Sequence, residues 1–565
     1  MAPRSRYRTP AEWTPPTESG ILGLVRVFGS CDSFVEATGT LRLGRLVANA
    51  TFLEALLRHG PYDTHEIFCA TEAERARVRE LVDSFPDGRT LGRRLDLRLH
   101  LELPSRMRQA PWETMHFGGW SRYLPSIAWL RATLSPRYFP LTGLIHSIDG
   151  PSQAGQLRRL LAAPLGAADS VFCTSRAGRE AFANQIAIVS EREGLSWKGR
   201  LDPVPLGVDE RFFSPPDRGG ARARLGVSPQ ARVALWLGRI SATSKADLGP
   251  LLHQWRALAQ EDGNRLLVLA GGATAAEAES IGQVARDLGI HGSVRILPDV
   301  DEGRKMDLLS GADVFVSPVD NHQETFGISV VEAMAAGLPV VASDWDGYKD
   351  LVDHGVTGFL VPVDWAPPPP EVVLLRQVLE PSLAQFAQAQ AVSPDPASLR
   401  QNLSLLLSDP ARSRSMGAAG REMTRRSFSW KAVVARSVAV WEELSRTGTG
   451  MPVPGAGSVD PEILDPAAVF AGYGSRPSGP PEGSACLTEL AREVLAGRIP
   501  MPATFSDLMP ISDGKLLTAL VLGLRSGSKD AGLHLRESAV ATGRPIEEAA
   551  WLLSWLRKYG LVEIG

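Results

Sequence analysis

The sequence predicts an α/β protein built from two doubly wound domains and followed by a small helical module. Two stretches alternate short apolar runs with helical patterns, which is typical of a parallel sheet covered by helices. A third stretch, at the carboxyl-terminal end, has helical periodicity and follows a segment rich in Gly, Pro and Ser. With 565 residues, at roughly 100–200 residues per domain, the chain is long enough for about three or four domains.

The first predicted domain spans residues 21–204 and follows a proline-rich segment, residues 1–20, that we expect to be flexible. Its expected strands are the apolar runs at residues 21–28, 65–69, 139–148 and 168–175. Apolar positions at helical spacing predict a helix over residues 43–57, and another helix is expected from residue 176. This order predicts a parallel sheet with helices on both faces.

The second predicted domain, residues 205–427, repeats this pattern more regularly. Its expected strands are residues 233–237, 266–270, 294–297, 314–316, 339–343 and 359–361. Helical stretches such as residues 274–288 and 328–336 lie between the strands, as in a doubly wound sheet. Irregular sequence with a proline run then precedes a helical stretch near residues 383–391 and a long helix at residues 411–446, interrupted near Phe428.

A stretch rich in Gly, Pro and Ser, residues 447–484, predicts a linker. The module after it, residues 485–565, has expected helices at residues 487–495, 515–524, 533–542 and 546–559 and a short apolar end at residues 561–564. This order resembles a winged-helix-like module. Its basic residues are scattered among acidic ones, so we expect a protein or peptide partner, or self-association, and no binding of nucleic acid.

Composition restricts the class of protein. A net charge of −3 argues against a strongly basic nucleic-acid-binding protein. The four cysteines form no C-x-x-C pair and are expected to be buried and reduced: Cys31, Cys69, Cys173 and Cys486. No apolar run approaches the ~20 residues that span a bilayer, and the N-terminus lacks the apolar core of a signal peptide. We therefore expect a cytoplasmic protein, with peripheral attachment to a membrane left open.

Two cations follow the first expected strand of the second domain. Arg239 comes directly after Gly238 at the strand end, and Lys245 follows six residues later. Because doubly wound proteins bind ligands at the carboxyl ends of their strands, two cations there suit a diphosphate. The alternative is a solvated turn with two surface cations, and these residues alone do not separate the two interpretations.

Residues 324–332 form an E-x7-E frame that begins with Glu324 and ends with Glu332. A helix is expected to begin near Ile328, and its free N–H groups, with Gly327 allowing close approach, predict a phosphate site. Glu332, about one turn into the helix, is placed to accept hydrogen bonds from ribose hydroxyls, and Glu324 from sugar hydroxyls. Taken singly, each Glu also fits an ordinary exposed charge; together, in this setting, they favour a binding site.

Several motifs in one order resemble the family 4 retaining glycosyltransferases, which have the GT-B fold of two Rossmann-like domains facing a cleft. They are residues 205–209 (PLGVD), Gly238-Arg239 with Lys245, the E-x7-E frame, residues 337–342 (GLPVVA) and residues 355–359 (GVTGF). The resemblance covers residues 21–446 and is strongest over residues 205–362. It implies that residues 428–446 form a closing helix on the first domain. The chain departs from the family in continuing well beyond this helix.

The resemblance implies roles at the donor site. Arg239 and Lys245 would hold the donor diphosphate, and Glu332 would bind the ribose. Glu324 would hold the donor sugar and phosphate together with three backbone amides, those of Phe326, Gly327 and Ile328.

The resemblance also implies a histidine of the first domain near the sugar. His146 fits that place after an expected strand, and His116 is a rival. Gly39 and Thr40 lie in the first strand–helix loop, where the acceptor and the phosphate approach in this family. The family often has paired glycines in that loop, whereas this chain has Gly29 and the single Gly39.

The implied reaction is hexosyl transfer (class EC 2.4) from a nucleotide sugar to an unidentified acceptor, with retained anomeric configuration. Arg239, Lys245 and the helix N-terminus would stabilise the leaving diphosphate in place of a metal, so we expect no metal and no cofactor besides the nucleotide-sugar co-substrate. The acidic triplets at residues 299–301 and 344–346 are interpreted as a turn and as scaffold. The alternatives are a catalytically retired GT-B scaffold that acts through its carboxyl-terminal module, and an epimerase.

Overall fold

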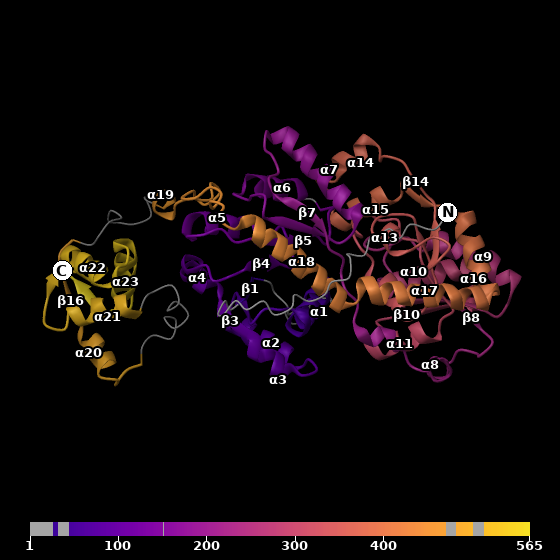
Figure 1. Cartoon of the computed structure of the whole chain (residues 1–565), viewed down its shortest axis with the longest axis horizontal. Coiled ribbons are helices and arrows are strands. Elements are labelled where there is room, and N and C mark those ends of the chain that lie inside the picture. The colour runs from indigo at the N-terminus through magenta and orange to yellow at the C-terminus, as the bar shows by residue number, and fades with distance from the viewer. Residues whose placement is uncertain (1–25, 32–43, 151, 471–481, 501–513) are drawn as a thin grey trace.

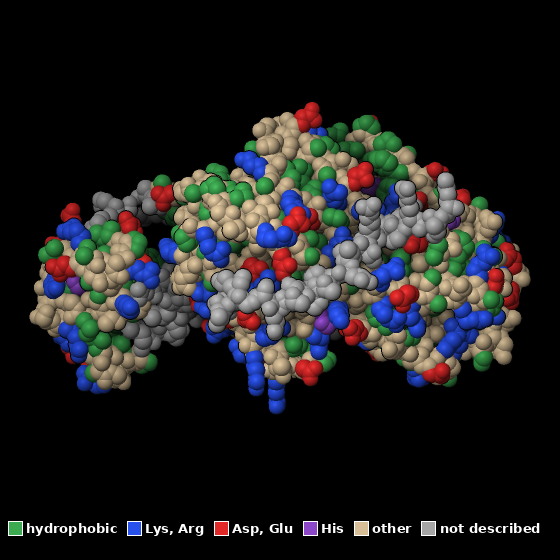
Figure 2. All heavy atoms as spheres, in the orientation of Figure 1, with side chains coloured by type: hydrophobic (Ala, Val, Ile, Leu, Met, Phe, Trp, Pro, Cys, Tyr) green, Lys and Arg blue, Asp and Glu red, His purple; other side chains and the backbone are tan. Residues whose placement is uncertain are grey.

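The computed structural model describes residues 26–31, 44–150, 152–470, 482–500 and 514–565. These residues form two doubly wound domains and a small carboxyl-terminal domain, as the sequence predicted (Figure 1). Figure 2 shows basic and acidic side chains interspersed on the face that it draws, which agrees with the small net charge of −3.

The first domain is built on a seven-stranded parallel sheet with the order β3-β2-β1-β4-β5-β6-β7. Its strands are β1 (Val27–Ser30), β2 (Thr64–Cys69), β3 (Leu95–Leu99), β4 (Thr114–Phe117), β5 (Leu141–Leu144), β6 (Ser170–Cys173) and β7 (Arg200–Pro203). Its helices are α1 (Gly44–His59), α2 (Glu72–Asp83), α3 (Gly88–Leu91), α4 (Leu103–Gln109), α5 (Leu124–Leu134), α6 (Gln153–Ala162) and α7 (Arg176–Glu193), with 3-10 turns η1 (Gly92–Arg94) and η2 (His100–Glu102). The strands β3, β4 and β7 were not expected from the sequence, and most of the strand expected at residues 21–28 lies outside the described residues.

The second domain contains a six-stranded parallel sheet with the order β10-β9-β8-β11-β12-β13. Its strands are β8 (Arg232–Leu237), β9 (Arg265–Gly271), β10 (Val294–Pro298), β11 (Val314–Ser317), β12 (Val340–Ser343) and β13 (Gly358–Val361). Its helices are α8 (Arg218–Leu225), α9 (Gly249–Glu261), α10 (Ala275–Asp287), α11 (Glu302–Gly311), α12 (Ile328–Ala335), α13 (Tyr348–Leu351), α16 (Pro396–Ser408) and α17 (Pro410–Phe428), with 3-10 turns η3 (Glu210–Phe213) and η4 (His291–Ser293). All the strands predicted for this domain are present.

An insertion between β13 and α16 reaches back to the first domain. It contains β14 (Val363–Trp365), α14 (Pro370–Leu375), α15 (Pro381–Ala389) and β15 (Val392–Pro394), with β14 and β15 paired antiparallel. Arg376 forms an ion pair with Asp149, in the loop after β5, and Gln385 Nε2 donates a hydrogen bond to the Asp149 carbonyl at 2.8 Å. The insertion therefore bridges the two domains on one side.

The chain crosses between the domains at two neighbouring points. The first crossing follows β7, and the second joins α17 to α18 (Trp430–Gly448) at Ser429, close to the predicted interruption at Phe428. The backbone N–H of Val208 donates to the Phe428 carbonyl at 2.8 Å, which ties the crossings together. Trp430 packs so closely on Gly207 that a Cβ added there would lie 2.3 Å from the indole ring.

Helix α18 packs on the first domain against α1. The Trp441 indole N–H donates a hydrogen bond to the Thr142 hydroxyl on β5 at 3.0 Å, and the Trp441 side chain is fully buried. Helix α18, which follows the second domain in the sequence, is thereby part of the core of the first domain.

A buried ion pair organises the start of β5. Arg131 on α5 donates two hydrogen bonds of 2.8 Å to the carboxylate of Asp169, and both side chains are 0 % exposed. The same carboxylate accepts hydrogen bonds from the backbone N–H groups of Leu141 and Gly166, each at 2.8 Å. Every oxygen of this buried charge is thus satisfied, as a buried carboxylate requires.

The carboxyl-terminal domain combines helices with a three-stranded antiparallel sheet of order β17-β16-β18. The sheet contains β16 (Ser484–Leu487), β17 (Lys529–Asp530) and β18 (Val562–Ile564). The helices are α20 (Glu489–Leu495), α21 (Gly514–Gly523), α22 (Ala531–Thr542) and α23 (Ile546–Lys558), while the short α19 (Pro466–Val469) lies in the preceding segment. The predicted helices are present and enclose an apolar core of their own; the likeness to a winged-helix module stays a prediction.

Candidate functional site

The loop after β8 carries the two predicted phosphate-binding cations, Arg239 and Lys245. Arg239 is exposed, and its Nη2 donates a hydrogen bond to the Ser244 carbonyl at 2.9 Å, which brings the two parts of the loop together. The loop also packs closely on the end of β9: a Cβ added to Gly271 would lie only 2.1 Å from the Gly238 carbonyl oxygen. The φ of Gly271 is +133°, so both its backbone and its surroundings favour glycine.

Lys245 reaches the E-x7-E frame directly. Its Nζ forms an ion pair with the carboxylate of Glu324, whose Oε1 accepts a hydrogen bond from the Phe326 backbone N–H at 3.2 Å. Burial by itself raises the pKa of Glu324, but the charge and hydrogen bond of Lys245 outweigh it, and the pKa is lowered. Burial likewise works against the charge of Lys245, and Glu324 outweighs it and raises the pKa of Lys245. The two side chains therefore form an ionised pair.

Helix α12 begins where the sequence predicted it, at Ile328. Its N-cap is Gly327, with φ +109° and no side-chain hydrogen bond to the first turn. A Cβ on Gly327 would lie 2.3 Å from the ring of Tyr348, so no larger residue fits at this N-cap. No cap side chain occupies the first turn, and the helix dipole favours an anion at that end.

Glu332 lies on α12 and is buried, at 7 % exposure. Its Oε1 accepts a hydrogen bond from Lys305 Nζ on α11 at 2.7 Å. Burial raises the pKa of Glu332, and Lys305 opposes this shift only in part. The alternative of an ordinary exposed helical Glu is therefore wrong, although a ribose contact is not thereby established. Lys305 was not expected at the site, since only the packing of α11 against the sheet brings it there.

His146 follows β5 and faces the second domain through its backbone. Its carbonyl accepts a hydrogen bond from the Thr325 hydroxyl at 2.6 Å, and its Nε2 lies 2.5 Å from the Gly118 carbonyl oxygen. The backbone of His146 thus contacts the E-x7-E frame, while its ring lies against Gly118 of the first domain, and the role of the ring near the sugar stays a prediction.

His116, the rival histidine, lies inside the first domain. It is on β4 and is buried, and its Nδ1 lies 2.9 Å from the Thr142 hydroxyl. Burial, with a smaller contribution from the charge of His146, lowers the pKa of His116 to about 3. The ring packs on Trp441 at 5.3 Å between centroids. A neutral core histidine describes His116 better than a sugar ligand does. The other expected residues of this region, Gly39 and Thr40, lie outside the described residues.

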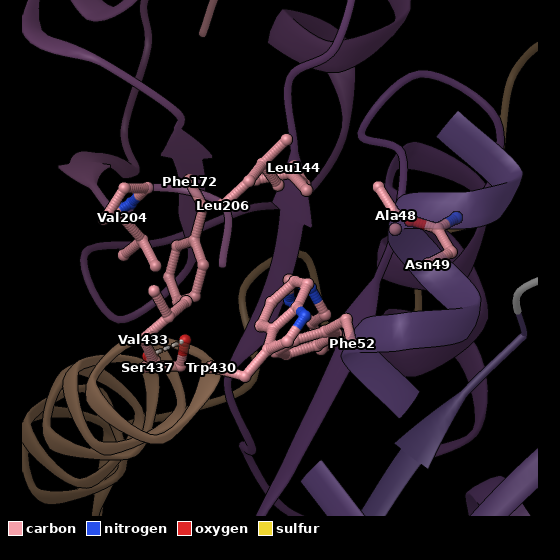
Figure 3. Close-up of a pocket in the computed structure, with 13 residues that line it drawn as sticks. Ala48, Asn49, Phe52, Leu144, Phe172, Val204, Leu206, Trp430, Val433 and Ser437 are labelled. Atoms are coloured by element: carbon pink, nitrogen blue, oxygen red, sulfur yellow. Dashed lines mark hydrogen bonds between the residues drawn. The ribbon is translucent and has the colours of Figure 1, made fainter. Parts of the chain in front are cut away.

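A small apolar pocket opens beside His116, between α1, the carboxyl ends of the first sheet and α18 (Figure 3). The empty space in and at the mouth of this pocket is about 350 Å³, part of which is open solvent. Most of its lining is hydrophobic, and the residues are Ala48, Asn49, Phe52, His116, Gly118, Leu144, Phe172, Val204, Pro205, Leu206, Trp430, Val433 and Ser437. The Gly118 carbonyl, which lies against His146 Nε2, links this pocket to the end of β5.

Direct contacts hold the two domains together around Glu324. The Thr174 hydroxyl, after β6, donates to the Thr325 carbonyl at 2.9 Å, and the Ser147 hydroxyl donates to Gln323 Oε1 at 3.2 Å. At the start of α7, Arg176 Nε donates to Asp350 Oδ1 at 3.0 Å. The E-x7-E frame therefore lies at the domain interface.

One residue interpreted as scaffold lies in the site. Asp346 follows β12, and its carboxyl group is electrostatically coupled to both Lys245 and Glu324. Its neighbour Gly347 packs on the E-x7-E frame, since a Cβ there would lie 2.5 Å from the Thr325 carbonyl oxygen. The spacing along the chain gives no signal for this approach, which depends on β11 and β12 being neighbours in the sheet.

Within the part of the chain that the structure describes, no group of three His, Cys, Asp or Glu residues is arranged to hold a metal ion. The prediction that the protein needs no metal stays a prediction. The described helices also include none that is long and apolar enough to cross a membrane.

Comparison with known proteins adds a family match to the second domain. Residues 231–367 match the model of glycosyl transferases, group 1. The chain is 37% identical over 201 residues to a D-inositol 3-phosphate glycosyltransferase of Actinosynnema mirum, which is 34% of this chain and 46% of that protein. It is 32% identical over 262 residues to D-inositol 3-phosphate glycosyltransferase 1 of Catenulispora acidiphila, covering 45% of this chain and 54% of that protein. The chain thus spans about half the length of the curated relatives it matches.

Among solved structures, the chain is similar to a glycosyltransferase from Rickettsia africae, with a TM-score of 0.50 and 13% identity. The match covers 74% of this chain and 98% of that chain. At this identity the likeness shows the fold alone: the two facing Rossmann-like domains form the GT-B fold that the sequence predicted.

Proposed function

We propose that the protein is a glycosyltransferase that takes a sugar from a nucleoside diphosphate sugar and transfers it to an acceptor. One observation carries the proposal: the ionised pair of Lys245 and Glu324 lies beside the Gly327 N-cap of α12, at the interface of the two domains. These residues belong to the segment that matches the glycosyl transferase model. Ligands of doubly wound domains bind at such strand ends.

Arg239 and Lys245 hold the diphosphate in this proposal. The ammonium group of Lys245 has three donors, so it is able to contact Glu324 and a phosphate oxygen at the same time. Arg239 is exposed at the edge of the same loop and adds a second, planar donor group. The N-terminus of α12 completes the anion site with the backbone N–H groups of Gly327 and Ile328. The Phe326 N–H, which donates to Glu324 in the structure, would exchange this partner for the donor.

Glu332 binds the ribose, and Glu324 binds the sugar. A carboxylate has acceptor sites on both of its oxygens, so the bond between Glu332 and Lys305 leaves capacity for ribose hydroxyls. Lys305 also counters the charge of Glu332, which makes its burial tolerable. His146 supplies a further polar group from the first domain, next to the contact between its carbonyl and Thr325.

The reaction retains the anomeric configuration of the sugar in this proposal. Arg239, Lys245 and the N-terminus of α12 stabilise the negative charge that develops on the leaving diphosphate. The acceptor attacks from the face that the diphosphate leaves, and a phosphate oxygen takes its proton. The interdomain contacts around Thr325 exclude water, which would otherwise hydrolyse the donor.

The test is a thermal-shift screen of the full chain against UDP, GDP, ADP and TDP. A ligand at about a hundred times its Kd stabilises the folded state by ~2.7 kcal/mol, so one nucleotide is expected to raise the melting temperature by roughly 5–10 °C. The nucleotide sugar of the same base is then incubated without acceptor, and slow release of the sugar is expected. If no nucleotide shifts the melting temperature and no nucleotide sugar is turned over, the proposal is wrong. An epimerised sugar as product would replace it with an epimerase.

A further inference from the structure

Asp346 adopts a backbone conformation that few residues tolerate. Its φ is +47°, in the left-handed region that favours glycine, and Asp and Asn enter this region more readily than other residues. The loop that holds it has little freedom, because the next residue, Gly347, packs directly on the backbone of Thr325 and Phe326. Asp346 is thus fixed beside the Glu324 end of the E-x7-E frame.

The carboxyl group of Asp346 is only half satisfied. Its Oδ1 accepts a hydrogen bond from the Tyr348 backbone N–H at 3.0 Å. Its Oδ2 is buried and, among the described residues, has no hydrogen-bond partner. A buried polar atom without a partner destabilises the folded state, so the fold holds this oxygen in place at the expense of stability. Such an atom at a binding site is suited to a ligand.

The charged groups around Asp346 allow only one of the two neighbouring carboxyls to ionise easily. Glu324, from the loop after β11, repels a charge on Asp346, and Lys245, from the loop after β8, attracts it. Lys245 is already paired with Glu324. From α13, the Tyr348 hydroxyl bonds to Ser317 at 2.9 Å. Burial first, and the repulsion by Glu324 second, raise the pKa of Asp346 well above its usual value.

We propose that Asp346 is a hydrogen-bond donor of the donor site, and that the proton on its Oδ2 binds an oxygen of the diphosphate. This rests on the function proposed above for the same site. A neutral carboxyl leaves Arg239 and Lys245 opposed by Glu324 alone, so the site keeps a net positive charge for an anionic ligand. An ionised Asp346 would cancel that charge and repel the diphosphate. Asp346 therefore makes diphosphate binding depend on a proton.

The test compares two variants that keep the left-handed backbone. Asp346→Asn keeps a neutral side chain with N–H donors, and Asp346→Gly removes the group without strain. Inorganic pyrophosphate serves as a probe that does not depend on the base, and UDP serves as a second probe. Binding is measured by calorimetry from pH 6 to pH 10, and the protonation of the ligand itself is the same for every variant.

At pH 6 we expect Asp346→Asn to bind as tightly as the wild type and Asp346→Gly to bind about tenfold more weakly. As the pH rises, the wild type is expected to lose affinity relative to Asp346→Asn by up to tenfold per pH unit, because each binding event then takes up a proton. Three results would each overturn the proposal while leaving the proposed function intact. They are wild-type affinity in Asp346→Gly, weak binding by Asp346→Asn, and a ratio of wild-type affinity to Asp346→Asn affinity that does not vary with pH. Failure of the wild type to bind either probe would overturn both.

Discussion

Replacement of Arg131 by Met tests how far the first domain depends on one buried charge pair. The substitution keeps most of the side-chain volume but removes both 2.8 Å hydrogen bonds to Asp169. It also removes the bond from Arg131 Nη1 to the Phe139 carbonyl at 2.7 Å. Asp169 keeps only its two backbone donors, and at 0 % exposure water does not replace the lost partner.

The expected loss follows from this complete burial. Removing one partner of a buried ion pair leaves an uncompensated charge and destabilises the fold by roughly 3–5 kcal/mol. For a domain of this size, each kcal/mol lowers the melting temperature by about 2–4 °C, so we expect the melting temperature of the first domain to fall by roughly 6–20 °C. In the proposed function, the stabilisation by a bound nucleotide should change little, because the pair lies at the start of β5 and β6, at the opposite end of the first sheet from the strand ends that meet the second domain.

The measurement is urea unfolding followed by tryptophan fluorescence, with Arg158→Met as the matched control. Arg158 lies in the same domain and pairs with Glu193 at the surface, with the two side chains 54% and 33% exposed. A surface pair of this kind contributes about 0–1 kcal/mol, so the control should unfold almost as the wild type does. A loss below about 1 kcal/mol in Arg131→Met would refute the reasoning, since the pair would then behave as an exposed one.

Three further predictions concern the site. Arg239→Ala and Lys245→Ala should each lower turnover by roughly 100-fold or more, because each removes a charge that stabilises the leaving diphosphate. The control Arg256→Ala, at an exposed position, should retain activity. Wild-type turnover in either site variant would contradict the assignment. Asp320 is buried in the loop after β11, and burial raises its pKa from 3.8 to about 7. The folded state therefore holds this proton more tightly than the unfolded chain, and stability should be lost as pH rises from about 4 through about 7. Asp320→Asn should therefore gain up to ~4 kcal/mol over the wild type between pH 4 and pH 8 in urea unfolding, and a difference that does not vary with pH would count against this. Turnover should be unchanged in EDTA, and a substantial loss would mean that a metal takes part.

The strands that could be predicted differ physically from those that could not. Every strand of the second sheet has a short apolar run, because helices cover both of its faces. In the first sheet, β3 and β7 are the edge strands, and edges tolerate charge: β3 contains Asp96 and Arg98, and β7 contains Arg200 and Asp202. Charged residues at alternate positions break the apolar run on which the prediction depends. The central β4 has the sequence TMHF, and its polar residues Thr114 and His116 likewise interrupt the apolar run.

The residues of the site also differ in whether the local sequence could predict their positions. Arg239, Lys245 and Glu324 follow strand ends, and strand ends of a parallel sheet meet at one edge, so their meeting could be predicted from local sequence. Lys305 and Asp346 reach the site only through the packing of α11 and the order of β11 and β12. No spacing along the chain encodes these approaches. The burial of His116 likewise depends on α18, whose Trp441 comes from more than three hundred residues farther along the chain.

The paired crossings at Val208 and Phe428 limit how the two domains can open. One hydrogen bond joins the two connections, and Trp430 packs closely on Gly207. Sliding or twisting of one domain against the other would have to break both the hydrogen bond and this packing contact. The Phe326 ring also packs on Phe428 at 5.8 Å between centroids, so the E-x7-E frame lies close to these connections. Opening of the domains would have to break the hydrogen bonds of Thr325 to the first domain and the ion pair between Arg376 and Asp149. In the proposed function, entry of the donor and release of the diphosphate would depend on the breaking of these contacts.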